Sequence, residues 1–244
     1  SCTPQRLKRF NLENEFKNLQ KLALRVAKEA IIETGLNNNI KIAGCFSPLP
    51  GSYFKDKSIS KKEMIETYLS IGELQKDDVD LFIIETMSSI DEAVSAVEAL
   101  SNFNKEIILC FCLSEGDGTK LFSGENLKEA CDSIQIAKIN GLCLNCSQIK
   151  DISKGLDILK KYNLPYGALP NNFQSVKPLK LGMSVDNIKK RNDILIEDFV
   201  NYAVTWLNNG CTILGGCCEI TPDYINGLNN YLMNNRYKKI NLFN

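Results

Sequence analysis

Histidine is absent from all 244 residues of the chain. Its absence removes the commonest metal ligand and the commonest general base at neutral pH, so any metal chemistry must use cysteine sulfur or carboxylate oxygen. Long apolar runs are missing too, because none approaches the roughly 20 residues needed to span a bilayer. The first residues also lack the charged and then apolar pattern of a signal peptide. We therefore expect a cytoplasmic protein.

An excess of either charge is lacking as well. The chain has 29 basic and 29 acidic residues and a pI near 6.4. Such a balance gives no broad field that would gather nucleic acid or anionic lipid. The sequence therefore predicts small-molecule substrates and neither a nucleic-acid nor a membrane partner, and it leaves a homo-oligomer open.

Cysteine, in contrast, is abundant, with ten residues. A disulfide scaffold would explain such a number in a short secreted chain, but 44% of this longer chain is hydrophobic and a conventional core should suffice. Most of the cysteines lie in apolar, strand-like runs, where a free cysteine behaves as a small buried hydrophobe. We expect this of Cys45, Cys110, Cys112, Cys143 and Cys211.

Short apolar runs alternate with longer amphipathic segments, a pattern typical of a parallel sheet built from βα units. The strand-like runs span 40–46, 80–85, 106–113, 141–145, 165–169 and 211–214. The helical patterns span 12–34, 60–75, 90–100, 125–139, 151–162 and 197–209. The length is close to the roughly 250 residues of a TIM (β/α)8-type barrel, and no linker divides the chain. We therefore predict one α/β barrel domain over residues 1–244.

Local signals mark some boundaries. Gly35 provides a stop for the first long helix, and Ser60 with Glu63 forms a capping-box pattern at the start of another. Three long irregular stretches, at 47–58, 115–124 and 171–193, each follow a strand. In a barrel, such loops lie on the carboxyl-terminal face, where active sites are found. Taken alone, each loop is equally well explained as a surface insertion.

The strongest local signal is the pair Cys217-Cys218, which follows Gly215-Gly216 at the end of an apolar strand. The glycines permit the backbone turn that aims both sulfurs at one metal. Thr221-Pro222 then provides a helix start. Two thiolates do not fill a zinc shell, and Cys146, also at a strand end, is the candidate third ligand. Three thiolates leave one tetrahedral position open, as in catalytic zinc sites.

These motifs resemble the homocysteine S-methyltransferase family, whose barrel ends in Gly-Gly-Cys-Cys-x-Thr-Thr-Pro and carries an Asn-Cys pair at an earlier strand end. The resemblance covers nearly the whole chain, through segments 3–7, 43–44, 51–53, 84–86, 117–124 and 167–173. Segment 3–7 resembles the loop after the family's second strand. It implies that Cys146, Cys217 and Cys218 bind zinc and that Glu85 contacts the amino group of homocysteine. Asn171, in a Gly-Ala-x-x-Asn-x-Phe segment, is the second candidate substrate contact.

The sequence departs from the family pattern in two places. The family begins with a strand that ends in Asp-Gly-Gly, and no such segment exists here. We therefore expect a barrel that lacks the first strand and its helix, with an opening or a substitute strand beside the final strand. Glu219-Ile220 replaces the usual Gly-Thr just beyond the cysteine pair. Otherwise we expect Glu85, Cys146, Asn171 and Cys217 around one mouth of the barrel.

The ligand set agrees with methylation of a thiol. A free thiol with a pKa of about 8.5 is mostly protonated at pH 7, whereas a zinc-bound thiol is the nucleophilic thiolate. The resemblance implies transfer to homocysteine, giving methionine, from betaine, S-methylmethionine or a methylated folate or cobalamin carrier. Tyr53, Phe54 and Phe173 are candidate aromatic faces for a cationic donor.

Simpler interpretations stay open for each residue. Glu85 could cap a helix, Asn171 and Phe173 could be turn and anchor residues, and Asp117 is better explained as a turn former. Cys217 and Cys218 could be buried or redox-active thiols. Three functions therefore remain: an active thiol methyltransferase, a catalytically silent zinc-binding relative, and a thiol-based redox protein.

Overall fold

Six parallel strands form the central sheet of the computed structural model, which describes residues 2–35, 40–54, 58–181, 183 and 185–238. The order is β1-β2-β3-β6-β7-β8, and every neighbouring pair is parallel. The strands are β1 (Ala43–Phe46), β2 (Leu81–Met87), β3 (Glu106–Phe111), β6 (Gly141–Asn145), β7 (Tyr166–Leu169) and β8 (Ile213–Leu214). Each predicted strand range overlaps one of these strands, and the predicted α/β class is confirmed.

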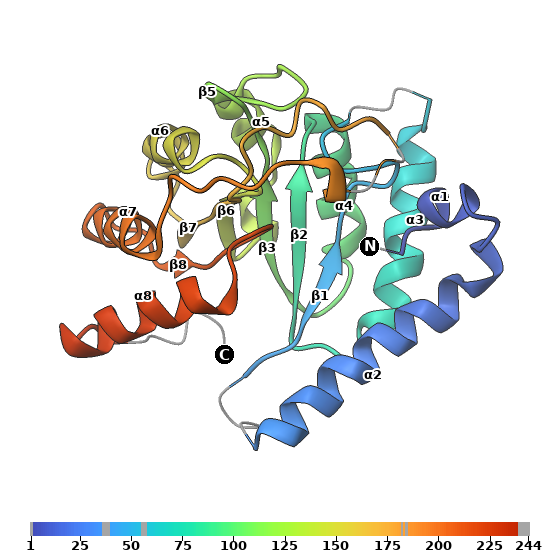
Figure 1. Ribbon diagram of the computed structural model, residues 1–244. Coiled ribbons are helices and arrows are strands. Elements are labelled where there is room, and N and C mark those ends of the chain that lie inside the picture. The colour runs from blue at the N-terminus through green and yellow to red at the C-terminus, as the bar shows by residue number, and fades with distance from the viewer. Residues whose placement is uncertain (1, 36–39, 55–57, 182, 184, 239–244) are drawn as a thin grey trace.

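Helices cover the outer face of the curved sheet (Figure 1). They are α3 (Lys61–Gln75), α4 (Ile90–Leu100), α5 (Leu127–Ser133), α6 (Ile149–Leu159) and α7 (Ile196–Asn208). Two further helices, α2 (Phe16–Thr34) and α8 (Pro222–Asn234), flank the two edges of the sheet. Short 3-10 turns occupy Glu13–Glu15, Ile136–Lys138 and Val185–Asn187. In the part of the chain that the structure describes, no helix has the length and apolar character needed to cross a membrane.

The predicted helix signals act as expected. Ser60 precedes α3 and its hydroxyl accepts a hydrogen bond from the Glu63 amide at 3.2 Å. Gly35 ends α2 in the left-handed conformation, with φ at 67°. Pro222 is the first residue of α8, directly after Thr221. These signals are reliable because each satisfies or terminates backbone groups that a helix end leaves unpaired.

Three expectations about local structure were wrong. The stretch 115–124 is not a loop, because β4 (Leu113–Ser114) and β5 (Asp117–Leu121) form a hairpin. The helical pattern at 125–139 is interrupted by extended backbone at Ile134 and Gln135, which separates α5 from a 3-10 turn. A short helix, α1 (Pro4–Lys8), occupies a segment that we interpreted as a loop. Its Thr-Pro start is the same signal that marks α8.

The sheet is open between β1 and β8, which form its two edges. Within the described residues, neither edge strand pairs with the other. The expected opening beside the final strand is therefore present. The sheet has six strands in the described residues, and the sequence predicts a barrel without its first strand.

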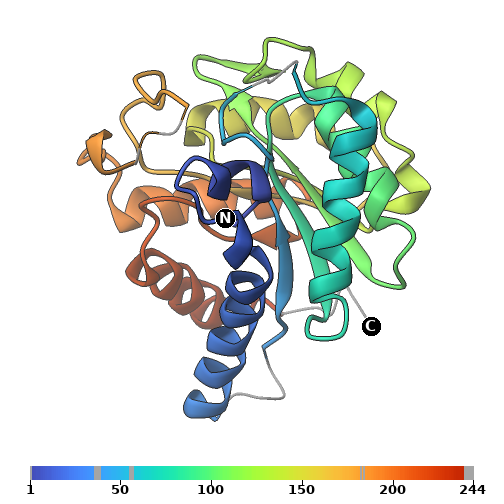
Figure 2. The same ribbon diagram turned by 90° about the vertical axis from the view of Figure 1, so that its right-hand side faces the viewer.

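All ten cysteines are free thiols. Cys110, Cys112, Cys143 and Cys211 are buried, as predicted. Cys45 is exposed, which contradicts the prediction. It lies on β1, an edge strand of the sheet. The helices α1 and α2 run alongside β1 but do not cover it in the way that a paired strand would (Figure 2).

Candidate metal and substrate site

Three cysteine thiols converge at the carboxyl end of the sheet. Cys146 directly follows β6, and Cys217 and Cys218 follow β8, with β7 between the two strands. The Sγ of Cys146 lies 2.7 Å from that of Cys217 and 3.6 Å from that of Cys218, and the last two are 3.9 Å apart. In the described residues, this is the group of potential metal ligands that the structure brings together. The convergence within about 4 Å that the sequence predicts is therefore present.

The backbone around the cluster explains how residues from two strands meet. The amides of Cys146 and Cys217 donate to the carbonyls of Leu169 and Pro170, at 3.0 and 2.8 Å, so the end of β7 holds both loops. Cys146 itself has a left-handed φ of 50°. Gly216 is required for a different reason from the one predicted, since a Cβ there would lie 2.3 Å from the Ile220 side chain. Close packing, more than a left-handed turn, demands this glycine.

The three thiols share negative charge unequally. Hydrogen bonds with Cys146 and then with Cys217 lower the pKa of Cys218. Hydrogen bonds with Cys217 and Cys218, and then burial, raise the pKa of Cys146. One thiolate flanked by two protonated thiols is what Coulomb repulsion favours where no cation is near. The cluster can therefore bear three thiolates only together with a positive charge.

Tyr53 contacts the cluster from the loop after β1. Its hydroxyl donates to the Sγ of Cys146 at 3.0 Å. Burial raises the pKa of Tyr53, and the neighbouring Cys146 and Cys112 raise it further. The hydroxyl therefore keeps its proton and acts as the donor. The sequence analysis proposed Tyr53 as an aromatic face for a substrate, and it missed this contact with sulfur.

Asn171 and Phe173 lie behind the cysteines. The Asn171 amide donates from Nδ2 to the Cys146 carbonyl at 2.7 Å, and its Oδ1 accepts from the Phe173 amide at 3.3 Å. Both residues are about 3% exposed, and Phe173 packs in a small core with Cys112 and Val176. This arrangement supports the interpretation of Asn171 as a residue that positions Cys146. Its direct contact with a substrate stays a prediction.

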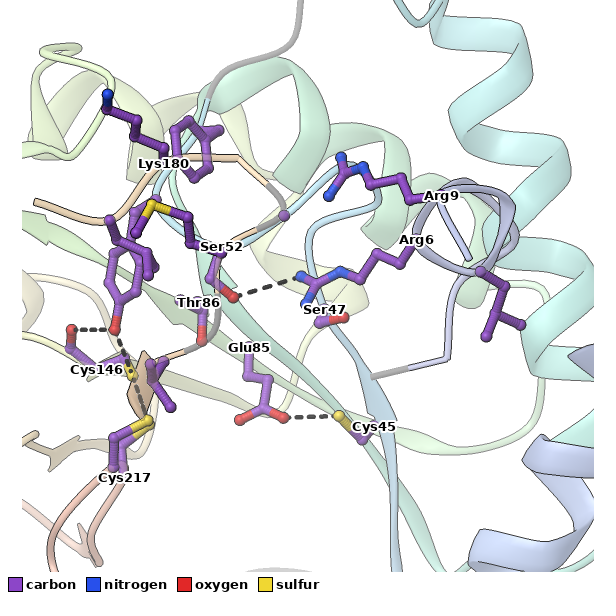
Figure 3. A pocket seen from close by; sticks show the side chains of 18 of the residues that line it. Arg6, Arg9, Cys45, Ser47, Ser52, Glu85, Thr86, Cys146, Lys180 and Cys217 are labelled. Atoms are coloured by element: carbon purple, nitrogen blue, oxygen red, sulfur yellow. Dashed lines mark hydrogen bonds between the residues drawn. The ribbon is translucent and has the colours of Figure 1, made fainter. Parts of the chain in front are cut away.

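A cavity of about 640 Å³ opens above the cluster (Figure 3). Glu85, Cys146 and Cys217 line it together, whereas Asn171, the fourth residue predicted around the mouth, is buried and does not line it. Glu85 accepts a hydrogen bond from the Cys45 thiol at 2.7 Å. Tyr53 and Phe54 also line the cavity, from one of the predicted loops. The rest of that loop includes residues 55–57, which fall outside the described residues.

Glu85 is held in place through its neighbour Thr86. The Thr86 amide donates to Asn145 Oδ1 at 2.8 Å, and Asn145 Nδ2 donates to the Thr86 hydroxyl at 3.1 Å. These bonds connect the ends of β2 and β6 across β3. They therefore fix the position of Glu85 relative to Cys146. In the sequence, Asn145 is recognisable only as part of the Asn-Cys pair. Nothing in the sequence indicates its hydrogen-bond partner.

Three cationic side chains that were not predicted also line the cavity, Arg6 and Arg9 on the wall opposite the cysteines and Lys180 on the side of Cys146 (Figure 3). Arg6 lies in α1, and Arg9 is the residue directly after it. Lys180 lies in the segment 171–193. Residues 182 and 184 of that segment fall outside the described residues. The signal that was available is the Thr-Pro helix start, which places Arg6 and Arg9 three residues apart on one helical face.

The chain resembles known proteins in sequence. The family profile described as homocysteine S-methyltransferase matches residues 1–232. A selenocysteine methyltransferase of Astragalus bisulcatus is 30% identical over 157 residues, which are 62% of this chain and 44% of that protein. Homocysteine S-methyltransferase 2 of Arabidopsis thaliana is 30% identical over 170 residues, 67% of this chain and 48% of its own length. The chain therefore spans about half the length of these relatives.

Solved structures share the fold. The metallated form of the homocysteine methyltransferase MmuM from Escherichia coli superimposes with a TM-score of 0.71 and 21% identity, over 94% of this chain and 76% of that one. The oxidised form of the same protein gives a TM-score of 0.72 with the same identity and coverage. These matches identify the same α/β architecture.

Proposed function

The chain belongs to the homocysteine S-methyltransferase family, and we propose that it transfers a methyl group from a small methylated donor to the thiol of homocysteine. The observation that carries the proposal is the convergence of three thiols, from the ends of β6 and β8, on one wall of a cavity that also holds Glu85. The donor is betaine, S-methylmethionine or a methylated carrier, and the product is methionine.

The donor set fits zinc. Three thiolates are soft ligands that suit a tetrahedral ion and leave one position open for a substrate. Two of the Sγ separations, 3.6 and 3.9 Å, match the roughly 4 Å expected around zinc. Cys146 and Cys217 are closer, at 2.7 Å, and would move apart by about 1 Å. Bound zinc would keep a coordinated substrate thiol in its thiolate form at neutral pH.

The protein's own residues would position the substrate. Glu85 would accept hydrogen bonds from the ammonium group of homocysteine, and Tyr53 would donate to Cys146 and so tune the sulfur. Tyr53 and Phe54 line the space left for the donor. In the transfer, a sulfur–carbon bond forms, the donor's bond to its methyl group breaks and its electron pair stays on the donor, and the thiol proton leaves beforehand.

Metal content of single variants tests the proposal. Cys146→Ala, Cys217→Ala and Cys218→Ala should each lose stoichiometric zinc by plasma mass spectrometry and lose methylation of homocysteine. Cys131→Ala is the matched control, because Cys131 is fully buried in α5, away from the cavity. Cys45→Ala should also keep zinc, but it is a poorer control for activity since Cys45 contacts Glu85.

The competing functions give different results in the same experiment. Full zinc occupancy in Cys217→Ala or Cys218→Ala would contradict the proposed ligand set. A wild-type protein that binds zinc and no homocysteine would be a catalytically silent relative. Purification without zinc, together with a reversible bond between Cys146 and Cys217, would indicate a thiol-based redox protein.

A further inference from the structure

Positive charge gathers around the cavity, with Arg6 and Arg9 opposite the cysteines and Lys180 on the side of Cys146 (Figure 3). Arg6, Arg9 and Lys180 line the cavity, and Glu85 is the acidic residue among the described residues that line it. The ion pairs between described residues involve none of these three cations. The cavity therefore has more cationic than anionic groups and offers an attractive environment for an anion.

Arg6 and Arg9 are fixed by neutral acceptors. The Nη2 of Arg6 donates to the Pro48 carbonyl at 2.8 Å and to the Ser52 hydroxyl at 3.4 Å. Arg9 donates to the Pro50 carbonyl, and the nearby Thr3 hydroxyl donates to the Leu49 carbonyl at 2.8 Å. These bonds attach α1 to the loop after β1. Within the described residues, these carbonyl and hydroxyl oxygens hold the guanidinium groups in place without an ion pair.

The Arg6 guanidinium also keeps free donors. No hydrogen bond from its Nη1 is present in the described part of the chain, and its Nε is buried without a partner. Burial and then Arg9 lower the pKa of Arg6, whereas Glu92 raises it. Both lowering effects mean that the charged form is disfavoured where it stands, and an anion bound at Arg6 would relieve this cost.

The groups lie in a particular order across the cavity. Cys146 and Cys217 lie on one side, Glu85 lies between, and Arg6 and Arg9 lie on the other side, with Ser47 and Ser52 near Arg6 (Figure 3). Sulfur, carboxylate and guanidinium thus follow one another. An amino-acid thiol carries a thiol, an ammonium and a carboxylate, so this order offers a complementary group for each.

We propose that Arg6 binds the carboxylate of an amino-acid substrate in this cavity, with Arg9 as a second positive charge beside it. The carboxylate belongs either to the thiol substrate or to a zwitterionic methyl donor, since both occupy the same cavity. This inference rests on the proposed function and adds to it that the substrates must carry an anionic group.

Binding of ligand pairs that differ only by the carboxylate tests the proposal. For the zinc-loaded protein, calorimetry compares homocysteine with 3-mercaptopropylamine, its decarboxylated counterpart, and S-methylmethionine with 3-aminopropyl-dimethylsulfonium. In the wild type, the carboxylate of one pair should improve affinity by about 10- to 100-fold. In Arg6→Gln, this preference should fall below about threefold. Arg6→Lys should retain part of it, because the charge remains but the planar fork does not.

Lys8→Gln is the matched control, because Lys8 lies on the same short helix, is exposed and does not line the cavity. It should leave the preference unchanged. Zinc content and thermal stability of Arg6→Gln verify that its fold is intact. If this variant does not fold, Arg9→Gln is the second variant, with a smaller expected loss of the carboxylate preference.

The outcomes separate the two substrates and the two proposals. Loss of preference in the homocysteine pair assigns the carboxylate to the thiol substrate, and loss in the sulfonium pair assigns it to the donor. An Arg6→Gln protein that keeps both preferences within twofold of wild type overturns the inference, even if it still methylates homocysteine. A wild-type protein that binds no homocysteine overturns the proposed function, while the sulfonium pair still reports on Arg6.

Discussion

Four residues around the cysteine cluster have a left-handed backbone although none is glycine. Tyr53, Thr86, Cys146 and Glu219 have φ values of 68°, 61°, 50° and 63°. Such a conformation costs about 1–2 kcal/mol for each residue and persists only where the surroundings hold it. Each has a restraint: Tyr53 through its hydroxyl on Cys146, Thr86 through Asn145, Cys146 through the β7 carbonyls and Asn171, and Glu219 through an ion pair.

Glu219 is the residue at which this strain can be removed without touching a thiol. It directly follows Cys218, and its carboxylate lies 3.4 Å from Lys190. We expect Glu219→Gly to raise the free energy of unfolding by about 0.5–1 kcal/mol, because glycine adopts this φ freely and the half-exposed ion pair contributes at most about 1 kcal/mol. Urea denaturation measures the change, and zinc content should not differ.

Glu219→Gln is the control for this substitution. It removes the charge and keeps the strained backbone, so it should be slightly less stable than the wild type. A Glu219→Gly protein that is less stable than Glu219→Gln would show that the left-handed conformation at this position carries no cost.

At the scale of elements, the ends of β2 and β6 are joined although β3 separates them in the sheet. Asn145 reaches over β3 to Thr86 with two hydrogen bonds. This contact requires a curved sheet, because side chains on strands two apart would otherwise be about 10 Å from each other. The curvature brings Glu85 and Cys146 to one cavity.

Asn145→Ala tests this connection. The substitution leaves the Thr86 amide and hydroxyl buried without their partner, so we expect a loss of about 2–4 kcal/mol in the free energy of unfolding. The affinity for homocysteine should also fall, since Glu85 loses its support. Asn102→Ala is the control, because Asn102 follows α4, is exposed and donates to carbonyls in the last turn of that helix. Equal stability of the two variants would contradict the structural role of Asn145.

The elements differ in how well the sequence predicts them. The six strands were predictable because each lies in an apolar run of the sequence, such as Gly141–Asn145. The β4–β5 hairpin was missed since its residues are polar and its position depends on packing against α6, where Gly118 approaches the Asp151 carbonyl. The cysteine pair could be found because it is a local sequence motif. The partners of Asn145 and the place of Arg6 in the cavity could not be predicted, because they depend on tertiary contacts.

At the scale of the whole molecule, the cysteine cluster and α1 act at opposite sides of an open sheet. The cluster ties the end of β6 to the end of β8 across β7. The side chains of Thr3, Arg6 and Arg9 tie α1 to the loop after β1. Since neither edge strand has a second neighbour in the described residues, the position of β8 depends heavily on the cluster.

Removal of the metal should therefore destabilise the whole chain. A ligand that binds only the folded state stabilises it by about 4 kcal/mol when its free concentration is 1,000 times the dissociation constant. For a chain of this size, 1 kcal/mol corresponds to about 2–4 °C in Tm, so chelation from that condition should lower Tm by roughly 8–16 °C. Differential scanning calorimetry with and without chelator measures the shift, and added zinc should restore it. Cys218→Ala should start near the chelated value and not respond to chelator, whereas Cys131→Ala should respond like the wild type. If complete removal of zinc leaves the wild-type Tm unchanged, the three thiols do not share a metal that couples β6 to β8.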